Sequence, residues 1–162
     1  NLEKTVNNPD KPSRENMLRG ANIAGQAIHI ASTTASHAFS YPMTAHFNVP
    51  HGHAVGLTLS YVFEFNANVT EETCQDPRGQ AFVRERMQEL VTLLKTTSVE
   101  EAKNKLIDIM KSIHLKTTLS ELNINDEGRQ IILKEGFNPE RIKNNPGKIS
   151  EEAFKKILDQ IQ

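Results

Sequence analysis

The chain has 162 residues, a formal net charge of −1 and 37% hydrophobic residues, which are ordinary values for one globular domain that buries a core. Positive and negative charges nearly balance and no basic face stands out, which argues against a nucleic-acid partner. Cys74 is the only cysteine, so an internal disulfide is excluded and a reducing, cytoplasmic location is expected.

The N-terminal residues are polar and contain no visible signal peptide. The sequence also lacks a run of 18 apolar residues, so no membrane partner is expected. The chain begins with Asn1 rather than Met, from which we expect a fragment or a processed piece of a longer protein.

Apolar residues recur with helical spacing along nearly the whole chain, and no segment alternates with period two. Ser13 predicts the N-cap of a first long helix, from residue 14 to about residue 39. Pro42 predicts that this helix stops at Tyr41, because proline disfavours helical geometry in the residue before it. A loop is then expected as far as Pro50.

Shorter helical segments are predicted along the rest of the chain. One begins near His51 or Gly52 and reaches residue 66, and the next begins at Asp76 and Pro77 with the aspartate as cap. The later signals are a capping box of Ser98 and Glu101, helices near 126–134 and 139–143, a turn at 144–148, and a last helix capped by Ser150. The fold class expected over residues 1–162 is all-α, as a single helical bundle-like domain.

Residues 20–63 contain no Asp, Glu, Lys or Arg, although these types make up 24% of the chain. Five of the six histidines lie in the same stretch, between His29 and His53. A surface in water would not lack charge over such a length, so we expect this stretch to be buried. Buried imidazoles need partners, so these histidines are either hydrogen-bonded structural groups or ligands that face a site.

Two of these histidines, His37 and His51, are the candidates for a shared site, although a buried histidine is more often a hydrogen-bonded core residue than a ligand. His37 is expected near the end of the first helix and His51 at the start of the next, so the loop between them can bring both side chains to one cleft. Neutral imidazole is a common ligand for zinc and iron. Two imidazoles alone hold such an ion loosely, because a catalytic site normally has about three protein ligands.

The other histidines fit a shared site less well. His53 diverges from His51 on a helix because the two are two residues apart, and His29 lies more than two turns from His37. His46 and His53 are either neighbours of the ligands or surface residues, and His114 is expected to be a plain residue at a helix end. Hydrogen-bond donors near the cleft would be Ser36, Ser40, Tyr41 and Thr44, although helix capping explains the serines equally well.

The segment RENMLRGANIAGQAI leads into SHAFSYP, and FNVPHGHAVGLTLSYVFEFN follows. In order and spacing this resembles the C-terminal helical domain of the iron-containing alcohol dehydrogenase family, where a helix with His-Ala is followed by a loop through Pro and by Pro-His-Gly at the start of the next helix. NNPGKISEEAFKKIL resembles the closing turn and last helix of that family. The resemblance therefore covers essentially the whole chain.

The resemblance implies one half of a two-domain enzyme with the dehydroquinate synthase-like fold. An N-terminal α/β domain would bind NAD or NADP, and the helical domain would hold Fe²⁺ or Zn²⁺ in the cleft between the two. His37 and His51 match two of the four metal ligands of the family, while the other two, an Asp and a His on one helix, have no counterpart in this sequence. We therefore expect an incomplete metal site, no dinucleotide-binding domain and no activity for this chain alone.

Many family members carry a second His four residues after the first, next to the nicotinamide and proposed for proton transfer. Tyr41 stands at that position here, which makes it the candidate catalytic residue and implies a different proton relay or a divergent substrate. The implied reaction interconverts a small alcohol and its aldehyde. The version SYPMTAHFNVPHGHAV loosely resembles reductases of phosphonate-type aldehydes.

Two alternatives stay open at this stage. The segment HGHAVGLTL is also similar to dehydroquinate synthase, so a related synthase or lyase could use the same cleft. A helical binding module without chemistry is the other alternative. The implied partners are a small alcohol or aldehyde and the protein's own dinucleotide-binding domain, and a homo-oligomer is compatible with the sequence.

Overall fold

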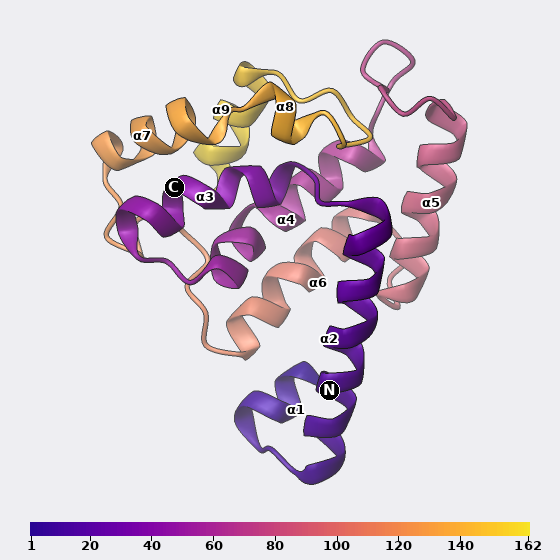
Figure 1. The fold of residues 1–162 in the computed structure, drawn as a ribbon, viewed down its shortest axis with the longest axis vertical. Helices are drawn as coiled ribbons and strands as arrows, with labels where there is room; N and C mark the ends of the chain where they lie inside the picture. Colours follow the sequence, from indigo (N-terminus) through magenta and orange to yellow (C-terminus); the bar gives the residue numbers. More distant parts are fainter.

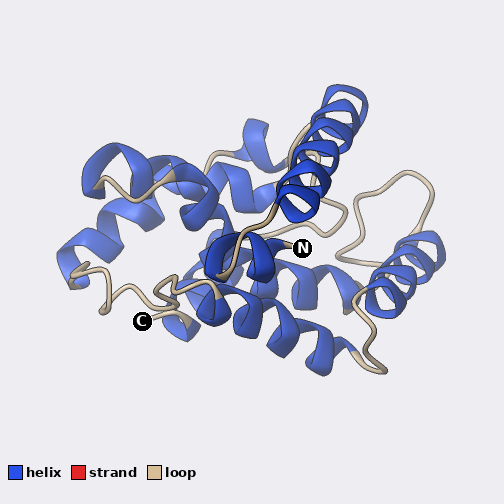
Figure 2. Cartoon of the chain, turned by 90° about the horizontal axis from the view of Figure 1, so that it is seen from below, coloured by secondary structure: helices blue, strands red, loops and turns tan.

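The computed structural model describes residues 1–162, and it consists of helices joined by loops and turns (Figures 1 and 2). The only β-type pairing is an isolated bridge between Cys74 and Gly147, so the all-α prediction is confirmed. The helices are α1 (Leu2–Asn7), α2 (Lys11–Ala31), α3 (Ala35–Phe47), α4 (His51–Ala67), α5 (Gln80–Leu93), α6 (Val99–Ser112), α7 (Asp126–Gly136), α8 (Pro139–Ile142) and α9 (Glu151–Gln160).

The first long helix differs from the prediction at both ends. Asp10, not Ser13, is the N-cap of α2, and its carboxylate accepts a hydrogen bond from Ser13 N at 2.8 Å. The Ser13 hydroxyl in turn accepts from Asp10 N at 3.1 Å, which completes a capping box. The helix ends at Ala31 rather than near residue 39. Three hydroxyl residues follow it, and Ser32 turns the chain with a φ of 60°.

A separate helix, α3, occupies the segment that the sequence predicted to contain a helix end and a long loop. Pro42 lies inside this helix, so the prediction that the helix stops at Tyr41 is wrong. Pro42, Phe39 and Met43 are all buried, and their packing outweighs the local preference of proline against helix. The predicted loop shrinks to residues 48–50, and α4 begins at His51 as predicted.

The start of α5 is also later than predicted. The Asp76 carboxylate accepts hydrogen bonds from the backbone N–H and from the guanidinium of Arg78, so it stabilises a turn rather than a helix end. Gly79, with a φ of 86°, is the residue that precedes the helix. The helix therefore begins at Gln80, not at Asp76 and Pro77.

The later helices follow the predictions closely. Ser98 caps α6 by accepting from Glu101 N at 3.1 Å, but the Glu101 carboxylate accepts from Thr97 rather than completing a capping box. Ser150 caps α9 by accepting from Ala153 N at 3.1 Å. The helices predicted at 126–134 and 139–143 are α7 and α8, which differ from those bounds by one or two residues.

Two hydrophobic clusters hold these helices together. In the larger one, α3, α4, α7 and α9 meet, and the ring of Phe39 stacks on that of Phe154 with 3.6 Å between ring centroids. In the smaller one, Phe63 of α4 packs with Val83 and Val91 of α5 and with α6. Because α4 contributes to both clusters, it is the central helix of the fold, and Figure 1 shows it between the α7–α9 group and α5.

The turn predicted at 144–148 is confirmed, and buried amides hold it in place. Asn145 and Asn66 exchange two side-chain hydrogen bonds, at 2.7 and 3.1 Å. Asn145 also donates to the carbonyl of Gly147 at 2.7 Å. Since both asparagines are buried, these bonds satisfy groups that would otherwise be costly to remove from water.

The charge-free stretch is buried only in part. Residues 20–32 are exposed, and so are His46 and His51, so the expectation of burial is wrong for most of α2 and for three of the five histidines. Every residue from Gly20 to Ala31 on α2 is exposed, and Ile30 is 85% exposed. Leu18, just before this range, is 73% exposed. Figure 1 shows α2 projecting from the body of the molecule, with α1 at its far end. None of the helices combines the length and apolarity needed to cross a membrane.

Candidate metal and active site

The structure brings His37 and His51 together. Their ring centroids lie 5.3 Å apart with an interplanar angle of 59°. His37 is the third residue of α3, so it lies near a helix start and not near a helix end as predicted. The three-residue loop runs back along α3, and α4 therefore begins beside the first turns of that helix.

Ser40 connects the two histidines. Its hydroxyl donates to the carbonyl of His37 at 2.7 Å and lies 3.1 Å from Nδ1 of His51. A hydroxyl has one hydrogen, so the Ser40 oxygen accepts from Nδ1–H of His51 while it donates to His37. This assignment leaves Nε2 of His51 without a proton and free to bind a ligand.

Burial also favours the neutral form of His37. Desolvation first, and the neighbouring His51 second, hold the pKa of His37 below its ordinary value of 6.5. A histidine must be neutral to bind a metal ion. The environment of His37 therefore suits a ligand at neutral pH.

The pair fits one half of a metal site. Two imidazoles that bind one ion at about 2.0–2.1 Å and at a tetrahedral angle place their ring centres roughly 5 Å apart, and the observed 5.3 Å agrees with this separation. No group of three or more His, Cys, Asp or Glu side chains could hold a metal ion within this chain. A complete metal site would need ligands in addition to His37 and His51.

Tyr41 lies at the edge of the same site. Its ring centroid is 5.9 Å from that of His51, and its side chain is 45% exposed. The guanidinium of Arg141, on α8, lies 4.4 Å from the centroid of the Tyr41 ring. No sequence signal predicts this contact, because one hundred positions separate the two residues and no motif connects them.

The other histidines lie apart from the pair. His46 bonds to the Glu135 carboxylate at 2.7 Å, and His53 lies 2.7 Å from the carbonyl of Lys116. His29 is exposed on α2, and His114 is an exposed residue just after α6, as predicted for a plain residue at a helix end. Of the six histidines, only His37 and His51 share a site.

The whole chain matches a known protein family. The model of the C-terminal part of the Fe-containing alcohol dehydrogenase family matches residues 1–162. The chain belongs to this family. The resemblance seen around His37 and His51 is therefore confirmed over the whole chain.

Relatives within the family reduce or oxidise small molecules. The phosphonoacetaldehyde reductase of Streptomyces viridochromogenes is 29% identical over 150 residues, which are 93% of this chain and 37% of that protein. The NADPH-dependent butanol dehydrogenase of Clostridium saccharobutylicum is 27% identical over 158 residues, 93% of this chain and 38% of that protein. This chain thus spans less than half the length of these family members.

A solved structure gives the same result. The sulfoacetaldehyde reductase of Bifidobacterium kashiwanohense, solved in complex with NAD⁺, superposes with a TM-score of 0.79 at 26% identity. The superposition covers 99% of this chain and 39% of that one. The iron-dehydrogenase C-terminal fold predicted from the sequence is therefore confirmed.

Proposed function

We propose that this chain is the helical part of an enzyme that interconverts a small aldehyde and its alcohol with a divalent metal ion and NAD or NADP. The observation that carries the proposal is the His37–His51 pair, with rings 5.3 Å apart and joined by Ser40. Family membership supports the reaction class. The relatives named above are reductases and a dehydrogenase, which favours this function over a synthase, a lyase or a module without chemistry.

His37 and His51 would hold the metal ion, Fe²⁺ or Zn²⁺, together with ligands from outside this chain. When bound, the metal would polarise the alcohol or carbonyl oxygen, and the dinucleotide would exchange hydride with the carbon that bears this oxygen. Ser40 holds His51 in the orientation and tautomer that present Nε2. α3 carries no charged side chain, so none of its own carboxylates or amines competes with His37 at the metal.

Tyr41 is the residue that we propose for proton transfer at the substrate oxygen. Its phenol is a donor and acceptor, and its ring lies next to that of His51. The exposure of Tyr41 leaves its hydroxyl accessible to a molecule in the site.

A cytoplasmic location, which the single cysteine favours, stays a prediction.

The exposed apolar residues of α2 support the presence of a further domain. Leu18, Ile23 and Ile30 are each more than half exposed, and a surface of this kind is typical of an interface. Family members are also more than twice as long as this chain. We propose that the remaining polypeptide, including a dinucleotide-binding domain, covers the exposed part of α2.

Metal analysis of the whole enzyme tests the proposal. His37→Ala and His51→Ala should each lose most of the bound metal and all measurable aldehyde reduction. His46→Ala is the matched control, because His46 lies on the same helix as His37 but bonds to Glu135 instead. If both ligand variants kept full metal content, the ligand assignment would be wrong.

The isolated 162 residues give a second test. They contain only two of the proposed ligands, so we expect weak metal retention and no NAD(P)-dependent turnover. Measurable turnover by this chain alone would contradict the proposed division of the enzyme into two parts.

A further inference from the structure

A hollow opens beside Tyr41. It has a volume of about 490 Å³ and lies between the end of α2, the first turns of α3, and α8. Its lining comprises Ser32, Thr33, Ala38, Tyr41, Glu140, Arg141, Lys143 and Asn144. Tyr41 belongs both to this hollow and to the surroundings of His51, so the hollow adjoins the candidate metal site.

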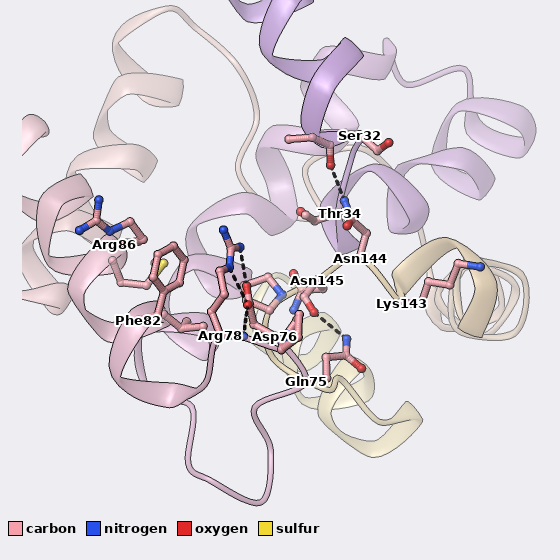
Figure 3. A pocket seen from close by; sticks show the side chains of 15 residues that line it. Ser32, Thr34, Gln75, Asp76, Arg78, Phe82, Arg86, Lys143, Asn144 and Asn145 are labelled. Carbon is pink, nitrogen blue, oxygen red and sulfur yellow. Dashed lines mark hydrogen bonds and ion pairs between the residues drawn. The ribbon is translucent and has the colours of Figure 1, made fainter.

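Asn144 fixes the wall of the hollow. Its amide donates to the carbonyl of Ala31 at 2.7 Å and to that of Thr33 at 3.1 Å, which ties the turn after α8 to the end of α2. Figure 3 shows Asn144 reaching towards this helix end, while Lys143 points away from the Arg78–Asp76 pair of the neighbouring pocket. The position of α8, and with it that of Arg141, is therefore set by contacts to the same segment that leads into α3.

Of the two cations at this hollow, only Arg141 lacks a carboxylate partner. Lys143 pairs with Glu140 at 2.7 Å, so its charge is balanced. Arg141 forms no ion pair, and its side chain lies over the Tyr41 ring instead. A guanidinium next to an aromatic ring still has N–H groups that can donate to a ligand, because the ring accepts from at most part of them.

We propose that Arg141 is a specificity-determining residue that binds the tetrahedral oxyanion of a substrate with an aldehyde at its other end. The inference rests on the proposed function, because it places the aldehyde at the metal held by His37 and His51. The planar fork of a guanidinium matches two oxygens of a phosphonate or a sulfonate. The hydroxyls of Ser32 and Thr33 line the same hollow and can donate to the remaining oxygen.

Steady-state kinetics of the whole enzyme test this role with phosphonoacetaldehyde, sulfoacetaldehyde and the uncharged propanal. Arg141→Met should lower kcat/KM by about 10- to 100-fold more for at least one charged aldehyde than for propanal, chiefly through KM. Arg141→Lys should recover part of the loss. Lys143→Met, which removes a cation already paired with Glu140, should have a much smaller effect.

The arms of the experiment separate the two oxyanions. If kcat/KM of Arg141→Met falls for phosphonoacetaldehyde alone, the site binds phosphonates. If it falls for sulfoacetaldehyde alone, the site binds sulfonates, and if it falls for both, the site accepts both oxyanions. An equal loss for propanal, or no loss for any aldehyde, would overturn the inference while the proposed function stands.

Titration calorimetry with methylphosphonate and with methanesulfonate tests oxyanion binding without turnover. Wild-type enzyme should bind at least one of them, and Arg141→Met should weaken that binding by about 10- to 100-fold, as for kcat/KM. If wild type reduced no aldehyde yet bound the oxyanion through Arg141, the proposed function would fail and the binding site would stand. Binding that is unchanged in Arg141→Met would overturn the inference.

Discussion

The hydroxyl of Ser40 lies 3.1 Å from Nδ1 of His51, one helical turn after His37, whose carbonyl accepts the hydrogen of that same hydroxyl. One side chain thus sets the tautomer of one candidate ligand and is itself oriented by the backbone of the other. Hydrogen bonds of this kind orient metal-binding histidines and raise their affinity.

Replacing Ser40 tests this relationship. Ser40→Ala should weaken metal binding by about 10- to 100-fold, because His51 loses the partner that fixes its tautomer. Competition with a chelator on the whole enzyme measures the affinity. Ser36→Ala is a matched control, since the Ser36 hydroxyl is buried on the same helix and forms no hydrogen bond. If Ser40→Ala and Ser36→Ala bound the metal with equal affinity, Ser40 would not be the residue that orients His51.

Tyr41 can be tested through its hydroxyl alone. Tyr41→Phe keeps the ring beneath Arg141 but removes the phenolic proton, so kcat should fall by about 100-fold or more while metal content stays unchanged. Tyr41→His should retain part of the activity, because imidazole also transfers protons. A Phe variant with wild-type kcat would show that Tyr41 does not transfer the proton.

Gly147 is expected to tolerate no side chain. A Cβ there would lie 2.7 Å from Cε1 of Phe65 and 2.9 Å from Cγ1 of Val69, so Gly147→Ala should destabilise the fold by about 1–3 kcal/mol. Gly25→Ala is the control, because nothing lies within 4 Å of that position on exposed α2. It should stabilise the chain by about 0.5–1 kcal/mol. Urea denaturation compares the two, and an unchanged midpoint for Gly147→Ala would contradict the packing.

Asp76 should make stability depend on pH in acid. The guanidinium and backbone N–H of Arg78 lower the pKa of the Asp76 carboxyl from its ordinary value of 3.8 to about 2. A folded-state pKa below the unfolded one favours folding above pH 3.8, and this contribution disappears as the pH falls through about 2.

Arg78→Gln should therefore raise the pKa of Asp76 towards 3.8, which NMR titration of the carboxyl carbon measures. The variant should be less stable than wild type near neutral pH and should approach it near pH 2. Arg86→Gln is the control, since Arg86 pairs with Glu85 and Glu89 and not with Asp76. A pKa that does not move in Arg78→Gln would show that the ion pair is not formed in solution.

Local signals in the sequence were sufficient where short-range chemistry decides the structure. Ser98 and Ser150 cap helices as predicted, because a cap needs only a side chain and the backbone three residues on. His37 and His51 could be selected for a shared site from spacing, and a family resemblance gave them a role. The helical fold class followed in the same way from apolar periodicity.

Tertiary packing decided what local preference could not. Pro42 predicts a helix end, yet α3 continues through it because Pro42, Phe39 and Met43 are buried against other helices. The lack of charge in residues 20–63 predicts burial, yet α2 is exposed, because composition reports only that a surface is apolar and not which polypeptide covers it.

The sequence by itself determined an all-helical chain with two histidines suited to one metal ion. Only the tertiary structure showed that Ser40 joins them and that Arg141 lies over Tyr41, one hundred positions along the chain. The physical reason is that helix formation and capping depend on neighbours in sequence, whereas a site depends on which helix ends the hydrophobic core brings together.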